Sequence, residues 1–487
     1  MPDPNFFPLV LPVLVLVAYA LLTLVMSPLF RGQSWILGPV SLIGIGMAGW
    51  FTWGLWKSWR VVGPMEGGFG MVRVDGFGLF AAAILLAITA LSVLGSMRFL
   101  EREEADHGEF YPLVLIAAAG MVMMVQTAHL VMVLVGLEVF SIALYILCGL
   151  TRGRLRSIES SLKYFLLGAF SSGFFVYGLA LLYGATGSLD LQSIGRAAAS
   201  APSPMLWMGM GLVFIGFAFK IAVVPFHHWV PDVYEGAPTN VTGFMAAATK
   251  TAAFAALLRF LVGAFGPSQE RWDPLVAVLA VLTMTVANLV ALAQTNVKRL
   301  LAFSSISHAG YLMIALVCTP DFGVRAVLFY LLSYAFMTVG AFAVAAAVGR
   351  GDASGETGYD LRAWAGLGRR RPWLALAMSV FLFSLAGIPP TAGFLGKYVI
   401  FTAAVESGRI GLAVIGVLNA VVGAYYYLSV LVAMWMREPD DASEAGAAPI
   451  SVSAAAVVAL SVIATLGLGV APGIFLEAAQ GLAAALL

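Results

Sequence analysis

Long apolar stretches, separated by short polar connections, run through nearly the whole chain. A helix crosses a bilayer in about 20 mostly apolar residues. Two of the stretches, 204–235 and 372–405, are longer than one straight helix needs and contain prolines, so we expect each of these helices to be interrupted. The sequence predicts fourteen spans in all, over residues 6–26, 36–56, 76–98, 111–127, 129–150, 158–185, 204–235, 239–263, 274–295, 299–318, 324–349, 372–405, 409–436 and 450–471. This pattern is typical of an all-α polytopic membrane protein.

The composition excludes several other classes of protein. Of the 487 residues, 61% are hydrophobic and only 10% are charged, which leaves a lipid bilayer as the expected surroundings. The 26 lysines and arginines nearly balance the 25 aspartates and glutamates, so no basic face indicates a nucleic-acid partner. Cys148 and Cys318 lie far apart in apolar runs, which excludes a disulfide scaffold or an iron–sulfur cluster built by this chain alone. No spacing of histidines and carboxylates resembles a metal site.

The distribution of positive charge predicts the orientation of the chain. Arginines and lysines are more frequent in the odd-numbered loops, for example at 152–156 and 369–371. The positive-inside rule therefore places the odd-numbered loops in the cytoplasm and both termini on the opposite side. The N-terminal stretch lacks a basic region, so we interpret 6–26 as a first span and not as a cleaved signal.

Apart from the cations in loops and at the ends of helices, four cations lie inside the predicted spans, and all four are lysines: Lys163, Lys220, Lys250 and Lys397. Arginine keeps its proton in proteins, whereas a desolvated lysine can lose it, so lysine suits a site that alternates between charged and neutral forms. Lys250 lies about 16 Å along its helix from Thr239, near the middle of a ~30 Å hydrocarbon core. Lys163 lies close to the start of its span, where reaching back to the interface is an open alternative. Structural roles are also open for Lys220 and Lys397, which flank the interrupted helices.

Glu138 is the one carboxylate that the sequence places deep inside a span. An isolated carboxylate there would take up a proton and become neutral, so a charged Glu138 requires a cationic partner. We expect this partner to be Lys220, although the spacing alone does not establish the pair. A purely structural ion pair is the alternative.

Three histidines are further candidates. His308 lies well inside the tenth span beside several serines, where a proton relay and a hydrogen-bonded interior histidine are both open interpretations. His227 and His228 follow Pro225 inside the interrupted seventh span.

The chain carries signs of an internal repeat. Residues 141–170 align with 307–336 without a gap, and Phe217-x-Phe219 before Pro225 matches Phe381-x-Phe383 before Pro389. This alignment pairs Lys220 with Ser384. Both correspondences relate spans that are five apart, and an odd offset reverses the direction of crossing, so the repeat would be inverted. Inverted repeats with interrupted helices are typical of secondary transporters, whose ion sites lie beside the interruptions.

The repeat divides the chain into four regions. We expect flanking helices 1–3 in residues 1–110, a first five-helix repeat with broken helix 7 in 111–263, a second, inverted repeat with broken helix 12 in 274–436, and helix 14 with a tail in 450–487.

The residues around the two interruptions resemble a known family. The segment 217–239, FAFKIAVVPFHHWVPDVYEGAPT, and the segment 387–397, GIPPTAGFLGK, are similar to the antiporter-like membrane subunits of respiratory complex I, the proton-pumping NADH:quinone oxidoreductase. The resemblance extends over essentially the whole chain. Within the family, the string PDVYEGAP at 231–238 indicates the subunit N group, the counterpart of mitochondrial NADH dehydrogenase subunit 2. His228 departs from the family, where a bulky apolar residue is more usual, and leaves open which imidazole faces the polar axis.

The resemblance implies a proton-translocating subunit without redox chemistry of its own. Glu138 and Lys220 would form the coupling pair, Lys250 would be the central proton carrier, and Lys397 would lie nearest the outlet. Lys163, His308, His227 and His228 would be possible relay residues.

The resemblance also implies the surroundings of the chain. No cofactor or metal is expected on it, whereas NADH, FMN, iron–sulfur clusters and quinone would be bound by partner subunits. The expected partners are the antiporter-like M subunit and the small K and J subunits, in a bacterial inner membrane with both termini periplasmic. Two alternatives stay open: a subunit of a modular cation/proton antiporter, and a structural spacer whose lysines only hold helices together.

Overall fold

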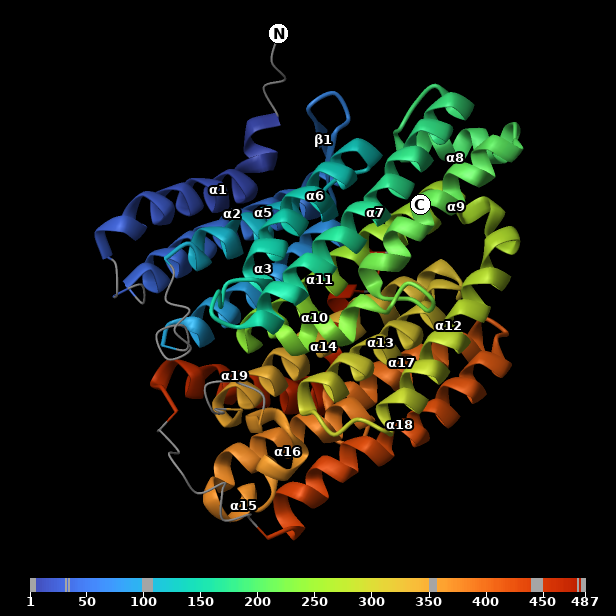
Figure 1. Cartoon of the computed structure of the whole chain (residues 1–487). Helices are drawn as coiled ribbons and strands as arrows, with labels where there is room; N and C mark the ends of the chain where they lie inside the picture. Colours follow the sequence, from blue (N-terminus) through green and yellow to red (C-terminus); the bar gives the residue numbers. More distant parts are fainter. Residues whose placement is uncertain are drawn as a thin grey trace.

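The computed structural model of the chain describes residues 6–30, 33, 36–98, 108–349, 357–438, 450–479 and 481–482. Its helices run roughly along one direction in an elongated bundle, with the blue N-terminal helices at one end and the orange helices at the other (Figure 1). Eleven of the described helices are long and apolar enough to cross a membrane. Each of the fourteen predicted spans coincides with a helix or with a pair of helices. The prediction of an all-α polytopic membrane protein is confirmed.

The N-terminal flank contains three helices and a small hairpin: α1 (Phe6–Met26), α2 (Leu37–Val62), β1 (Met65–Gly67), β2 (Val72–Val74) and α3 (Gly76–Ser96). The sequence did not indicate the hairpin, in which Met65 pairs with Val74 in antiparallel register. Asp75 caps the start of α3, because its carboxylate accepts a hydrogen bond from the Gly78 amide at 2.8 Å.

The first set of helices follows the flank, and one of its members is broken. It consists of α5 (Phe110–Val125), α6 (Leu130–Cys148), α7 (Leu155–Thr186), the short connecting α8 (Leu191–Ser200), the broken pair α9 (Pro204–Ile221) and α10 (Trp229–Gly236), and α11 (Thr239–Leu258), which continues as a π-helical turn over Arg259–Ala264.

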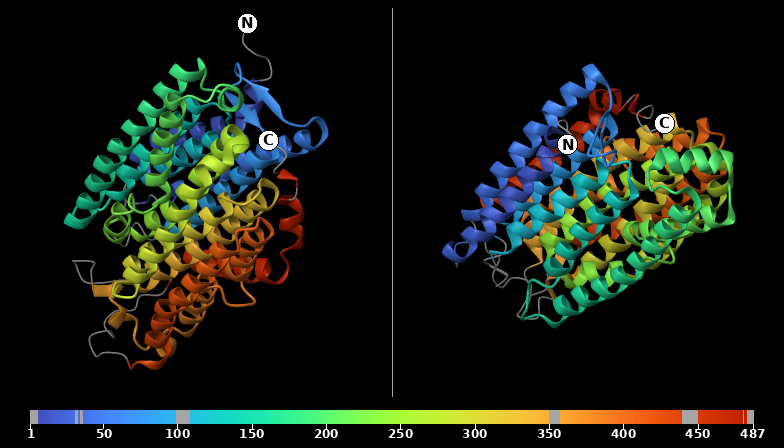
Figure 2. Two further views of the ribbon diagram at one scale, coloured as in Figure 1. Left: turned by 90° about the vertical axis from the view of Figure 1, so that its right-hand side faces the viewer. Right: turned by 90° about the horizontal axis from the view of Figure 1, so that it is seen from above.

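The second set repeats this order. It consists of α12 (Gln269–Ala291), α13 (Val297–Leu316), α14 (Pro320–Val348), the short α15 (Leu367–Arg370), the broken pair α16 (Pro372–Ala386) and α17 (Ala392–Glu406), and α18 (Ile410–Met436). In both sets the first two helices pack on each other, and the third packs on both halves of the broken helix. In the left view of Figure 2 the yellow helices of the chain lie between the green and the orange ones. Two helices, α19 (Val452–Val470) and α20 (Gly473–Ala479), complete the described chain.

The two broken helices end in the same way. Ala222 after α9 and Gly387 after α16 adopt the left-handed conformation, with φ of 63° and 90°. The next amide then bonds back to a carbonyl five residues earlier, Val223 to Ala218 and Ile388 to Phe383. The predicted interruptions are confirmed. The shared cap aligns Lys220 with Leu385, so the pairing with Ser384 that the aromatic residues indicated is wrong by one residue.

The most buried helices lie at the centre of the molecule. The apolar stretches of α11, α13 and α14 are 100%, 94% and 83% buried, whereas those of α1 and α19 are 28% buried. Helix α11 is fastened to α3 at both ends. Arg259 forms a two-bond ion pair with Asp75, at 2.6 and 2.8 Å, and the Asn240 amide donates to the Gly95 carbonyl at 3.0 Å.

Candidate functional site

Lys250 lies in the middle of α11 and is only 3% exposed. Its Nζ donates to both the carbonyl oxygen and the hydroxyl of Ser305, the latter at 2.7 Å, and it faces the ring of Tyr334 at 5.0 Å. The Tyr334 hydroxyl donates to the same Ser305 hydroxyl at 2.8 Å. No carboxylate of the described residues pairs with Lys250, so its charge is held by hydroxyl, carbonyl and ring groups alone.

His308 lies one turn beyond Ser305 on α13 and is also buried. Both ring nitrogens have hydrogen-bond partners: Nδ1 bonds to the Tyr330 hydroxyl, and Nε2 lies 3.2 Å from the Tyr427 hydroxyl. Tyr427 is bonded in turn to Ser304. An imidazole with a hydroxyl on each nitrogen can accept a proton on one side and release one on the other.

Lys397 lies on α17, directly after the second break. Its Nζ donates to the carbonyl oxygens of Leu385 and Ala386 at 2.8 and 2.9 Å, so the lysine caps the end of α16. It also faces the ring of Tyr311 at 4.9 Å. The lysine therefore has a structural contact whatever else it does.

These groups form one chain of contacts, joined by hydrogen bonds as far as Tyr334 and by ring contacts beyond it. It starts at Lys250, passes through Ser305, Tyr334 and the His308 cluster, and reaches Lys397 through Tyr311, whose ring lies 5.9 Å from that of His308. The sequence analysis named the lysines and the histidine but missed the tyrosines. A signal was available, because Tyr330 and Tyr334 are four residues apart and must share one face of α14.

Lys220 lies at the end of α9 and is held differently. Its Nζ donates to the Ser141 hydroxyl at 2.8 Å. Four aromatic rings surround it at 5.2 to 5.7 Å, those of Phe140, Tyr145, Tyr164 and Phe219. An aromatic cage of this kind stabilises a cation without neutralising it.

Glu138 is half-buried on α6 and accepts a hydrogen bond from the Ser172 hydroxyl of α7. Among the described residues it forms no direct ion pair with Lys220; each of the two groups is bonded to a serine instead. Ile142, one turn further along α6, is 54% exposed, so Glu138 lies toward an outer face of the chain.

Aromatic rings separate Lys220 from Lys250. Tyr164 of the cage stacks on Trp229 at 4.5 Å between ring centres, and Trp229 contacts Tyr234 edge-on at 6.4 Å. No hydrogen bond of the described residues joins the two lysines. The first set of helices therefore holds a caged lysine, whereas the second set lines a chain of hydrogen bonds and ring contacts that starts at Lys250.

The two adjacent histidines lie in the connection between α9 and α10. His227 is buried, whereas His228 is exposed, and their rings are 4.5 Å apart. Of the two, His227 is therefore the one that faces the interior. Its Nδ1 is buried without a hydrogen-bond partner among the described atoms.

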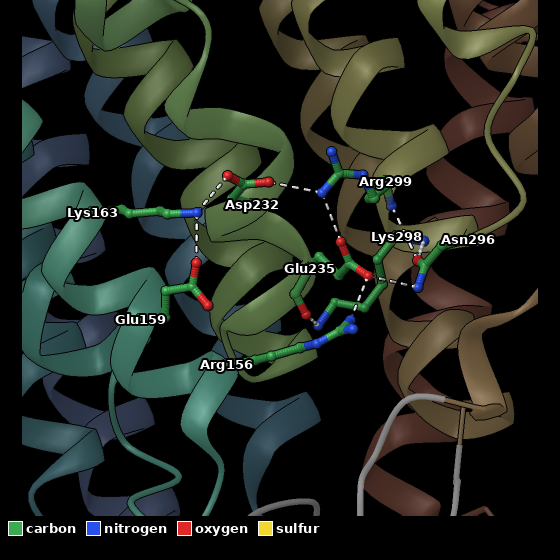
Figure 3. A network of polar contacts seen from close by, with 8 residues as sticks. All are labelled: Arg156, Glu159, Lys163, Asp232, Glu235, Asn296, Lys298 and Arg299. Atoms are coloured by element: carbon green, nitrogen blue, oxygen red, sulfur yellow. Dashed lines mark hydrogen bonds and ion pairs between the residues drawn. The ribbon is translucent and has the colours of Figure 1, made fainter.

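Lys163 lies outside the buried chain, in a surface network (Figure 3). Its side chain is 41% exposed and forms ion pairs with Glu159 at 2.6 Å and Asp232 at 2.8 Å. Asp232 also binds Arg299 at 2.8 Å. Reaching the interface, the alternative left open for Lys163, agrees with this position.

Buried charges at the helix ends were not foreseen. Asp75 is fully buried with Arg259, and Asp273 is 3% exposed and bound to Arg409. Both carboxylates are more buried than Glu138, although each directly precedes a predicted span. Other parts of the fold bury these helix ends, and a single sequence does not show which helix ends become buried in this way. Within the described part of the chain, no group of three or more histidines, cysteines and carboxylates is arranged to hold a metal ion.

Comparisons with known proteins agree with this geometry. Residues 127–423 match the family model described as NADH:quinone oxidoreductase/Mrp antiporter, TM. The chain is 44% identical to the NADH-quinone oxidoreductase subunit N of Trichlorobacter lovleyi, over 91% of this chain and 89% of that protein. A chain of respiratory complex I from Thermus thermophilus, solved with bound aureothin, is similar with a TM-score of 0.79 and 38% identity, over 97% of this chain and all of that one. A chain of the Mrp complex from Dietzia sp. shares the fold, with a TM-score of 0.86 at 23% identity over 98% of this chain and 97% of that one.

Proposed function

Because the chain belongs to the NADH:quinone oxidoreductase/Mrp antiporter family, in its subunit N branch, we propose that it translocates protons as a membrane subunit of complex I. Quinone reduction elsewhere in the complex supplies the driving force. This chain carries no redox chemistry of its own; NADH, FMN, the iron–sulfur clusters and quinone are bound by partner subunits. The M subunit and the small K and J subunits are its expected neighbours.

The observation that carries the proposal is the buried chain from Lys250 to Lys397. Hydrogen bonds join Lys250 to Ser305 and Ser305 to Tyr334, and ring contacts continue the route from Tyr334 to His308 and through Tyr311 to Lys397. Buried ionisable groups are costly inside a membrane and mark ion or proton routes there.

The two halves divide the work. In the first half, the aromatic cage and Ser141 keep Lys220 charged while Glu138 is held by Ser172. A shift in the charge at Glu138 changes the proton affinity of Lys220 and pushes its proton toward Lys250. Water must bridge the aromatic spacer for this transfer. In the second half, Lys250 passes the proton through His308 toward Lys397, the residue nearest the outlet.

The distribution of cations supports an orientation. The network around Lys163 lies at the odd-numbered loops, which we place in the cytoplasm of a bacterial inner membrane, with both termini periplasmic. His227 is the interior histidine of its pair and a candidate relay near the first break.

Substitution of the two central lysines tests the function. Intact complex that carries Lys250→Ala or Lys397→Ala, reconstituted in phospholipid vesicles, should translocate fewer protons per NADH oxidised than the unchanged complex. Undiminished translocation by both variants would rule the function out. A structural spacer predicts poor assembly but normal translocation per assembled complex, so the amount of complex is measured in the same preparation.

Copurification in mild detergent distinguishes a complex I subunit from the remaining alternative, a subunit of a modular cation/proton antiporter. A complex I subunit should copurify with an NADH-oxidising assembly, whereas a subunit of a modular antiporter should copurify with other antiporter subunits. The likeness to the Mrp chain bears on the fold alone.

A further inference from the structure

Helix α10, the short second half of the first broken helix, lies between α7 and α13 and contacts both. Two carboxylates, Asp232 and Glu235, lie three residues apart on it and therefore share one face. Their positions on α10 bring them between cations from the first repeat and cations from the second (Figure 3).

Asp232 is shared between the two repeats. One carboxylate oxygen binds Lys163 of α7 at 2.8 Å, and the other binds Arg299 of α13 at 2.8 Å. Glu235 extends the link, because it binds the same Arg299 at 2.8 Å and Arg156 of α7 at 2.9 Å. Each carboxylate thus joins a cation of α7 to Arg299.

Residues of α13 hold the end of α10 as well. Lys298 is 2% exposed and donates to the backbone carbonyls of Glu235 and Ala237 at 2.8 and 2.7 Å. Asn296 donates to the Glu235 side chain at 3.3 Å. The end of α10 is therefore fixed to the start of α13 by backbone and side-chain contacts together.

The two helices joined in this way, α7 and α13, also carry residues that contact Glu138 and Lys250. Helix α7 carries Lys163 near its start and Ser172, the partner of Glu138, further along. Helix α13 carries Arg299 near its start and then Ser305 and His308, which contact Lys250 and the tyrosines. A displacement of α7 against α10 would therefore change the position of Arg299 and, through it, the position of α13.

We propose that Asp232 is a positioning residue that couples the two repeats: it holds α7 and α13 in one arrangement, so that a change at Glu138 alters the geometry around Lys250. This inference rests on the proposed function. Isolated surface ion pairs contribute little, but a carboxylate shared between two elements acts on both, and residues that carry coupling affect it measurably.

A matched pair of isosteric variants tests the proposal. Asp232→Asn removes the shared charge. Glu159→Gln removes the other carboxylate partner of Lys163; Glu159 lies on α7 itself and, within the described residues, forms no ion pair with a second element. In reconstituted intact complex, Asp232→Asn should lower proton translocation per NADH by at least about twice the decrease seen with Glu159→Gln. Equal decreases would overturn the proposal, because the effect would then come from Lys163 losing a carboxylate.

Arg299→Gln cuts the same link from α13 and keeps the proposal testable if Asp232→Asn fails to assemble. The double variant Asp232→Asn/Arg299→Gln should lose no more than Arg299→Gln alone, since that variant already removes the ion pairs of both Asp232 and Glu235 with α13. Additive losses would contradict a shared link. Lys250→Ala is measured in the same experiment. Normal translocation by the Lys250→Ala variant would refute the proposed function. If that variant translocates fewer protons but Asp232→Asn and Arg299→Gln translocate normally, only the proposed coupling is refuted.

Discussion

Lys250 and Ser305 are joined by two hydrogen bonds, because Nζ of the lysine donates to both the carbonyl oxygen and the hydroxyl of the serine. Tyr334 donates to that same hydroxyl at 2.8 Å. Ser305 therefore stands between the lysine and the tyrosine that leads toward His308. One small side chain sets the geometry at the centre of the proposed route.

Ser305→Ala should slow proton translocation without preventing assembly. The lysine keeps the backbone carbonyl as an acceptor, but the Tyr334 hydroxyl loses its partner, and a buried donor without an acceptor costs about 1–3 kcal/mol. Ser307→Ala is the matched control, since the Ser307 hydroxyl is buried without a partner among the described atoms. Translocation per NADH is measured for both; equal effects would show that Ser305 has no special role.

Lys397→Arg separates the structural contact of this residue from proton transfer. A guanidinium can still donate to the Leu385 and Ala386 carbonyls, but it does not release its proton. We expect the complex to assemble and to keep its thermal stability while translocation falls. Lys397→Met should lose both properties. Normal translocation by the arginine variant would show that Lys397 only caps α16.

Tyr164 tests the aromatic cage around Lys220. Its ring faces the lysine at 5.2 Å, and its hydroxyl is buried without a partner in the described part of the chain. Tyr164→Phe should therefore leave translocation unchanged. Tyr164→Leu removes a cation–π contact worth about 0.5–2 kcal/mol and should lower translocation. The idea of a cage fails if the phenylalanine and leucine variants behave alike.

Asp75→Asn should destabilise the chain strongly. Removing one partner of a buried ion pair leaves the other charge unpaired and costs about 3–5 kcal/mol. The double variant Asp75→Asn/Arg259→Met removes both charges of this pair, leaves Arg73 without its longer contact to Asp75 at 3.6 Å, and should be more stable than Asp75→Asn alone. Thermal unfolding in detergent compares the stability of the two variants. A double variant that unfolds at a lower temperature than Asp75→Asn would contradict the prediction.

Much of the fold was predictable because membrane spans are set by local composition. Apolar length predicted where the long helices lie, and the prolines at 225, 389 and 390 marked both breaks. The hairpin at residues 65–74 and the short α8 escaped prediction, since neither has enough apolar residues to stand out.

The candidate site was predictable only where a residue was unusual for its surroundings. A lysine in an apolar run is conspicuous, so Lys220, Lys250 and Lys397 were found. Tyrosines such as Tyr334 are common at membrane interfaces, and nothing in one sequence shows that this one faces Ser305. That Glu138 and Lys220 each bond to a serine and not to one another is likewise a matter of tertiary geometry.

Because α3 and α11 are joined by one contact at each end, the lengths of the two helices between these contacts must match. Asp75 must meet Arg259 at one end while Gly95 meets Asn240 at the other. One inserted or deleted residue between these points would turn everything beyond it by about 100° and shift it by about 1.5 Å. One of the two contacts would then have to open. The lengths of α3 and α11 can therefore change only together. Neither helix should tolerate an insertion of the kind that a loop accepts.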